Sequence, residues 1–137
     1  LNEFLPRADV VTLSLPSTSE TMHLFGKDKI SLMKPSAVLI NVGRGTAVDT
    51  DALSDALYEG KIYGAALDVT DPEPLPAEHP LWNAPNTIIT PHISGGWNEH
   101  GNLERIFEII CANLSRYFSG EPLINVVDMS TGYRRNG

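Results

Sequence analysis

The run AVLINV at residues 37–42, followed at once by GRG at residues 43–45, decides the fold of this chain. A short apolar run that ends in breaker residues is typical of a buried central strand. The glycines on either side of Arg44 allow the backbone to turn sharply where that strand stops. Arg44 is therefore predicted at the carboxyl end of a core strand, the edge of an open α/β sheet where ligands bind. Its guanidinium suits a carboxylate or phosphate, although a solvated arginine in a tight turn explains this short segment equally well.

Strand and helix patterns alternate along the rest of the chain. Further strands are predicted at residues 10–15, 63–69 and 87–90, and helices at residues 27–33, 50–59 and 97–118. Strands that alternate with helices pair in parallel, and near-continuous apolar strands are buried on both sides. The sequence therefore predicts an α/β fold with a parallel sheet that is covered by helices on both faces.

Composition and charge limit the partners of this chain. Its 137 residues are enough for one compact domain with a hydrophobic core. A formal net charge of -7 argues against nucleic acid or an anionic membrane as the main partner. Cys111 is the single cysteine, so an intrachain disulfide is impossible, which fits a reducing cytosol. Because no apolar stretch is long enough to cross a bilayer, we expect a cytoplasmic protein without a membrane partner.

Each predicted strand ends in a loop rich in proline, glycine or charged residues. Arg44 follows the second strand, Asp68 and Glu73 follow the third, and His92 follows the fourth. Parallel strands would bring these loops to one edge, where they would combine an anion clamp with a proton donor. Taken singly, each residue has a plainer explanation, because loop carboxylates and histidines are usually solvated or structural. The other histidines lack cysteine partners and metal-ligand spacing, so no metal site is predicted.

Three segments carry a resemblance to a known family: LINVGRG at residues 39–45, ALDV at residues 66–69 with Glu73-Pro74, and TPH at residues 90–92. In order and spacing they resemble the D-isomer-specific 2-hydroxyacid dehydrogenases, which include phosphoglycerate dehydrogenase and the glyoxylate and hydroxypyruvate reductases. The resemblance implies an oxidoreductase that moves a hydride between NAD or NADP and the C2 carbon of a small 2-hydroxy or 2-oxo acid. It also implies a partial Rossmann-like, doubly wound α/β sheet.

The resemblance implies roles for residues that stand at the family's motif positions. Arg44 is expected to bind the substrate carboxylate, and His92 to exchange a proton with the substrate oxygen. Glu73 resembles the acid that pairs with this histidine, and Asp68 the aspartate that contacts the nicotinamide carboxamide. The residues expected at the cofactor are Leu15, Pro16, Val42, Gly43, Arg44, Asp68, His92 and Gly95. The segment GGWN at residues 95–98 departs from the family pattern, so that wall of the pocket is not predicted.

The resemblance further implies that the family's N-terminal part, with its G-x-G-x-x-G phosphate loop, is absent here. We therefore expect a fragment that is inactive by itself. Residues 1–118, including the helix 97–118, would be the C-terminal part of the NAD(P)-binding domain, and residues 119–137 a tail returning toward a substrate domain. The full-length protein is expected to be a homodimer. Two alternatives stay open: a nucleotide-sensing, corepressor-like protein on the same scaffold, and a truncated module without activity.

Overall fold

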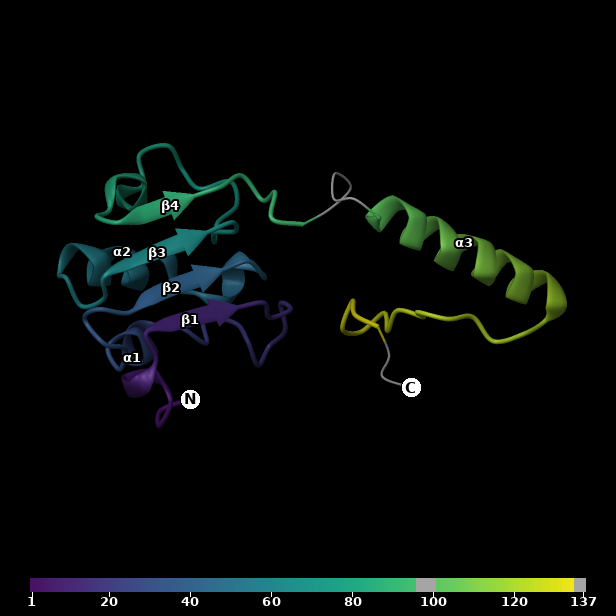
Figure 1. Ribbon diagram of the computed structural model, residues 1–137, viewed down its shortest axis with the longest axis horizontal. Coiled ribbons are helices and arrows are strands. Elements are labelled where there is room, and N and C mark those ends of the chain that lie inside the picture. Colours follow the sequence, from purple (N-terminus) through teal and green to yellow (C-terminus); the bar gives the residue numbers. More distant parts are fainter. Residues whose placement is uncertain (96–100, 135–137) are drawn as a thin grey trace. The chain divides into compact units, whose positions relative to one another are not determined.

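The computed structural model describes residues 1–95 and 101–134 and divides the chain into two compact units, Leu1–Ser94 and Gly95–Gly137. The first unit is built on a four-stranded parallel sheet with the strand order β1-β2-β3-β4 (Figure 1). The strands are β1 (Val10–Leu13), β2 (Val38–Asn41), β3 (Gly64–Leu67) and β4 (Thr87–Ile89). The predicted α/β fold with a parallel sheet is confirmed, although each strand is shorter than the sequence pattern suggests.

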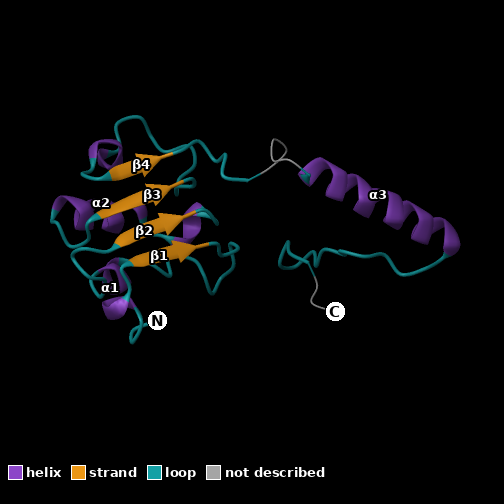
Figure 2. Cartoon of the chain, in the orientation of Figure 1, coloured by secondary structure: helices purple, strands orange, loops and turns teal. Residues whose placement is uncertain are grey.

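Helices and 3-10 turns fill the segments around these strands (Figure 2). They are η1 (Leu5–Arg7), α1 (Lys27–Ile30), η2 (Gly45–Ala47), α2 (Thr50–Tyr58) and η3 (Pro80–Asn83). Helix α2 begins where the sequence predicts, because the Asp49 carboxylate accepts a hydrogen bond from the Ala52 backbone N–H at 2.9 Å. Helix α1 is shorter than the predicted 27–33, since Leu32 and Met33 bond three residues back instead of four.

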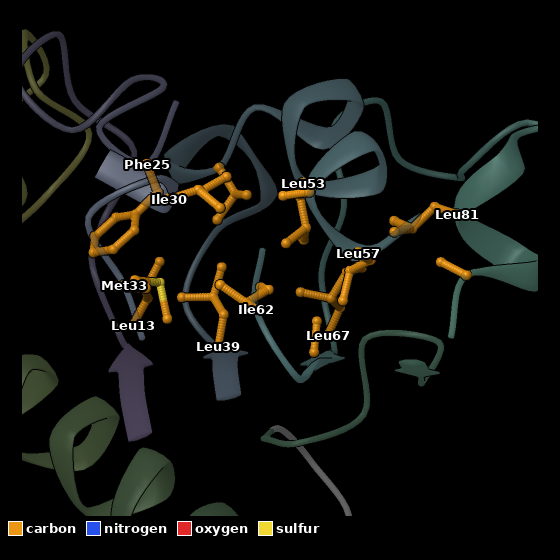
Figure 3. Close-up of a cluster of buried hydrophobic side chains, with 14 of the residues drawn as sticks. Leu13, Phe25, Ile30, Met33, Leu39, Leu53, Leu57, Ile62, Leu67 and Leu81 are labelled. Atoms are coloured by element: carbon orange, nitrogen blue, oxygen red, sulfur yellow. The ribbon is translucent and has the colours of Figure 1, made fainter. Parts of the chain in front are cut away.

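The hydrophobic core lies between one face of the sheet and helices α1 and α2 (Figure 3). Leu39 of β2 and Leu53 of α2 are fully buried, and Phe25, Ile30 and Ile62 pack into the same cluster. The strands follow one another in sheet order, so every connection steps in the same direction across the sheet. Right-handed connections that step in one direction place all their helices on the same face. This is the physical reason why the core of this unit is one-sided.

The prediction of helices on both faces of the sheet stays a prediction, because the helices of the first unit lie on one face only. No helix of residues 1–94 covers the second face, and all of these residues are described. Val10 of β1 and Ile88 of β4 lie on this face and are 57% and 65% exposed. Within the first unit, therefore, the sheet carries its helices on one face only.

The second unit is dominated by the long helix α3 (Asn102–Ser119). The sequence predicts a helix over residues 97–118; its predicted start lies outside the described residues, and its predicted end is correct to within one residue. Gly120, with φ of 69°, closes the helix in the left-handed conformation that glycine favours. Apolar side chains recur along α3 with helical spacing and are exposed within this unit: Leu103, Phe107, Ile110 and Leu114. Among the described residues, no helix is long and apolar enough to cross a membrane.

Ser54, on the buried side of α2, gives a test of the core. Its side chain is 2% exposed, and its hydroxyl has no hydrogen-bond partner among the described residues. An unpaired buried hydroxyl is unfavourable, and alanine is a better helix former than serine. We expect Ser54→Ala to raise the free energy of unfolding by about 0.5–1 kcal/mol, as measured by chemical denaturation. A variant that unfolds more easily than the wild type would show that the hydroxyl is stabilising.

Candidate functional site

The carboxyl edge of the sheet gathers the loops in which the sequence places the functional residues. The last residues of the four strands, Leu13, Asn41, Leu67 and Ile89, are paired across the sheet in one row. The loops that follow them therefore begin side by side. They carry Arg44 after β2, Asp68 and Glu73 after β3, and His92 after β4. This edge is the place where parallel α/β sheets bind ligands.

His92 and Glu73 form a close pair at this edge. The Nδ1 atom of His92 lies 2.7 Å from Oε1 of Glu73, and the two side chains are 45% and 40% exposed. With Nδ1 protonated, this N–H donates a hydrogen bond to the carboxylate, which orients the ring. In the described part of the chain, Nε2 has no protein partner, so this nitrogen is free to exchange a proton with a bound molecule. The structure thus brings the two residues into contact, while their catalytic roles stay predictions.

A cavity of about 320 Å³ opens beside this pair. Its polar groups include Glu73, Thr90 and His92, and its apolar wall includes Leu75, Trp82 and Ile89. A cavity of this size and mixed lining accommodates a small organic molecule. Arg44 is not among the described residues that line it, so the arginine and the histidine are at the same edge without sharing this cavity.

Asp68 is bound to the loop that carries His92. Its side chain is 4% exposed. The Thr90 hydroxyl donates to Oδ1 at 2.5 Å, the Ile93 N–H donates to Oδ1 at 2.8 Å, and the Ser94 N–H donates to Oδ2 at 2.9 Å. Burial by itself would raise the pKa of Asp68, but these hydrogen bonds to the charged form outweigh it and hold the pKa well below its usual range. The resulting stabilisation is present above the ordinary aspartate pKa of about 3.9 and is lost only as the pH falls through the lowered value.

Asn41 shapes the turn that presents Arg44. Its completely buried side chain accepts a hydrogen bond from the Gly43 N–H at 3.1 Å and donates one to the Arg44 carbonyl at 3.0 Å. The Arg44 side chain is exposed, and its Nη1 donates to the Gly43 carbonyl at 2.9 Å. An exposed guanidinium on a backbone fixed in this way has donors left for a bound anion.

The two glycines beside Arg44 allow neighbouring loops to approach closely. Neither has a positive φ, so the sharp turn expected from the sequence does not explain them. A Cβ atom at Gly43 would lie 2.6 Å from the Leu15 nitrogen, and one at Gly45 would lie 1.8 Å from the Thr70 carbonyl oxygen. These distances are shorter than van der Waals contact. The backbone of the Arg44 turn is thus packed directly against the loops that follow β1 and β3.

Several of the residues expected at the cofactor lie just beyond the ends of β1 and β2. Pro16 and Val42 are exposed and Leu15 is half-buried. Exposed apolar side chains next to a guanidinium suit a flat ring that carries polar groups, such as nicotinamide. Gly95, in the second unit, is exposed, and no atom of residues 1–95 or 101–134 lies within 4 Å of the position that a Cβ atom would take there.

Three residues at this edge were not predicted from the sequence. Asn41 could have been identified from the sequence, because it is a polar residue in an otherwise apolar strand. Thr90 could also have been identified, since it directly precedes the proline and histidine of the motif. Trp82 could not have been identified in this way: η3 folds the chain back toward the cavity, and the indole Nε1 donates to the Pro76 carbonyl at 2.8 Å.

Two other histidines contact carboxylates in the first unit. Nε2 of His23 lies 3.3 Å from Asp71 Oδ2, and Nε2 of His79 lies 3.1 Å from Asp51 Oδ1. The Nδ1 atom of His79 also accepts the Leu81 N–H at the start of η3. Over residues 1–95 and 101–134, no group of three or more histidine, cysteine, aspartate or glutamate side chains could hold a metal ion.

Known proteins are similar to this chain in sequence and in structure. Residues 1–94 match the family model of the D-isomer specific 2-hydroxyacid dehydrogenase, NAD binding domain. The chain is 45% identical over 130 residues to glyoxylate/hydroxypyruvate reductase B of Pectobacterium carotovorum, covering 93% of this chain and 39% of that protein. It is 43% identical over 121 residues to glyoxylate reductase of Thermofilum pendens, covering 88% of this chain and 35% of that protein.

A solved structure agrees with these sequence matches. The D-isomer specific 2-hydroxyacid dehydrogenase of Xanthobacter autotrophicus Py2, in complex with NADPH and MES, superposes with a TM-score of 0.82 at 38% identity. The superposition covers 97% of this chain and 53% of that chain. The chain therefore spans only part of the proteins it matches. It covers 39% and 35% of the length of the two reductases and about half of the Xanthobacter chain.

Proposed function

Because this chain belongs to the D-isomer specific 2-hydroxyacid dehydrogenase family through its NAD-binding domain, we propose that the protein carrying it is an NAD(P)-dependent oxidoreductase. The reaction interconverts a small 2-oxo acid and the corresponding D-2-hydroxy acid. The observation that carries this proposal is the His92–Glu73 pair, 2.7 Å apart at the carboxyl edge of a parallel sheet. The relatives named glyoxylate/hydroxypyruvate reductase and glyoxylate reductase support a small substrate.

Proton transfer is proposed to rest on His92. Bound NAD(P)H supplies the hydride, while the protein groups position and polarise the substrate. Nε2 of His92 donates a proton to the substrate oxygen during reduction and accepts it during oxidation. Glu73 accepts a hydrogen bond from the opposite ring nitrogen and so orients the ring. Positioned acid–base catalysis of this kind typically contributes roughly 10²- to 10⁴-fold to the rate.

The other residues of the edge are proposed to bind rather than to transfer protons. Arg44 would grip the substrate carboxylate with its exposed guanidinium. Leu15, Pro16 and Val42 would contact the nicotinamide end of the cofactor, together with Gly43, Asp68 and Gly95. In this proposal, residues 1–118 form the C-terminal part of the nucleotide-binding domain.

The proposal is tested with the intact protein, NADH or NADPH, and glyoxylate or hydroxypyruvate. Turnover is followed by the absorbance of the reduced cofactor, and the configuration of the glycerate formed from hydroxypyruvate is determined by chiral chromatography. We expect turnover with at least one combination and a D-configured product. Cofactor binding without turnover of any acid would replace this proposal by a nucleotide sensor, and the absence of both would refute it.

Arg44→Lys tests the role of the guanidinium at constant charge. Lysine lacks the planar fork that binds a carboxylate through two parallel hydrogen bonds. Since charge-assisted hydrogen bonds contribute about 1.5–3 kcal/mol, we expect kcat/KM for the 2-oxo acid to fall at least about tenfold. The affinity for NAD(P)H, measured by fluorescence titration, should stay nearly unchanged.

The matched control is Arg7→Lys, an exposed arginine of η1 away from the carboxyl edge. It should keep both the kcat/KM value and the cofactor affinity of the wild type. An Arg44→Lys protein with unchanged kcat/KM would show that the guanidinium does not bind the substrate.

A further inference from the structure

We propose that Asp68 is a positioning residue for His92, and that its carboxylate acts by folding the loop of residues 90–94. This inference rests on the proposed function, because it takes His92 as the proton donor. It gives Asp68 a task that is separate from the cofactor contact expected from the sequence.

The contacts connect residue 68 to almost every residue of the loop. The Asp68 carboxylate accepts hydrogen bonds from the Thr90 hydroxyl and from the backbone N–H groups of Ile93 and Ser94. Its backbone carbonyl accepts the His92 N–H at 3.0 Å. Asp68 lies just beyond the end of the neighbouring strand β3 and therefore binds the loop on both sides of His92.

The backbone of His92 needs such support. Its φ is 55°, in the left-handed region that residues other than glycine seldom adopt. A conformation of this kind persists only when the surrounding structure holds it. Glu73 contacts the ring of His92 and not its backbone, so it orients the imidazole without fixing the loop. The hydrogen bonds of Asp68 fix the loop instead.

A carboxylate is required for this arrangement, and an amide of the same shape would not serve. Oδ1 of Asp68 accepts from Thr90 and Ile93, while Oδ2 accepts from Ser94. Asparagine in either orientation would set its NH₂ group against a backbone N–H donor. The charge also matters, because the buried carboxylate stays ionised at neutral pH and strengthens all three hydrogen bonds.

The test compares Asp68→Asn and Thr90→Val with two reference variants in the intact protein. Thr90→Val removes one donor to Asp68 and keeps the shape of the side chain, whereas Thr90→Ser keeps the hydroxyl. Thr87→Val is the matched control, because Thr87 begins β4, the strand just before Thr90, and its hydroxyl donates to the Pro85 carbonyl, away from the loop. Misplacement of a catalytic group by about 1 Å can cost on the order of 10²-fold in rate.

We expect Asp68→Asn and Thr90→Val to lower kcat at least about tenfold. Thr90→Val leaves the carboxylate of Asp68 in place for the cofactor, so this variant should change KM and the dissociation constant of NAD(P)H little. Thr90→Ser should restore most of the rate, and Thr87→Val should match the wild type. If Asp68 acts only on the cofactor, Asp68→Asn weakens NAD(P)H binding while Thr90→Val has no effect. That outcome would overturn the positioning role.

A second measurement does not depend on activity and separates this inference from the proposed function. Amide hydrogen exchange is measured for Ile93 and Ser94, whose N–H groups donate hydrogen bonds to Asp68. Leu53 in α2 serves as an internal reference. In Asp68→Asn, the first two amides should lose protection while Leu53 keeps it. Unchanged protection would overturn the inference even in an active enzyme. A wild type without turnover would refute the proposed function alone, because loss of protection would still show that Asp68 folds the loop.

Discussion

His92→Ala is expected to lower kcat for reduction of the 2-oxo acid by roughly 10²- to 10⁴-fold, the usual contribution of a positioned general acid. Alanine removes the imidazole ring. In the wild type, Nδ1 of this ring bonds Glu73, and Nε2 has no partner among residues 1–95 and 101–134 and can donate to the substrate. The affinity for NAD(P)H should change far less. Steady-state kinetics and fluorescence titration measure the two quantities separately.

His23→Ala is the matched control for this prediction. His23 also contacts a carboxylate, that of Asp71, at 3.3 Å. It lies in a different loop, between β1 and α1, and does not line the cavity beside Glu73. Its replacement should leave kcat within about twofold of the wild type, as for a surface residue. If His92→Ala keeps more than about a tenth of the wild-type rate, proton donation by His92 is excluded.

Removal of the Glu73 charge shows how the pair works. Glu73→Gln keeps the shape of the side chain and takes away the charge that stabilises the protonated imidazole. Glutamine still offers an oxygen to Nδ1 but no charge, so kcat for reduction should fall while the dissociation constant of NAD(P)H changes little. Steady-state kinetics and fluorescence titration measure the two quantities separately. An unchanged kcat would show that the charge of Glu73 is not needed.

Gly45→Ala is expected to destabilise the fold by about 3 kcal/mol or more, at the upper end of what overpacking costs. The new Cβ atom would lie 1.8 Å from the Thr70 carbonyl oxygen and 2.9 Å from the Asp71 nitrogen. Both are backbone atoms, so no flexible side chain can move aside. The loops after β2 and β3 would have to separate, which displaces Arg44 as well. Chemical denaturation measures the loss of stability.

Gly26→Ala is the control for the added methyl group. Gly26 precedes α1 with φ of -84°, and the nearest atoms to its Cβ would be at 3.5 and 3.6 Å, which is ordinary contact. We expect the free energy of unfolding to change by less than about 1 kcal/mol. Alanine is a poorer N-cap than glycine, but the difference is only about 1 kcal/mol or less. Equal stability of Gly45→Ala and the wild type would show that the two loops have room to separate.

Local sequence patterns determined the elements of this protein and the order of its site residues. Short apolar runs bounded by glycine or proline predict strands, and their alternation with helical patterns predicts parallel pairing. Parallel pairing alone brings all the strand ends to one edge, so the common location of Arg44, Glu73 and His92 followed without any structure. The family motifs then added the pairing of Glu73 with His92, which the structure brings to 2.7 Å.

The tertiary structure alone decided how these residues are held. Asn41 holds the Arg44 turn and Asp68 holds the His92 loop through hydrogen bonds to their backbones. Gly45 lets the loop after β2 contact the loop after β3. The one-sided core of residues 1–94 also came from the structure, because it depends on the direction in which successive connections cross the sheet. None of these features is a property of a short segment. Each arises when residues from different strands meet at a fixed register, and local periodicity contains no information on that meeting.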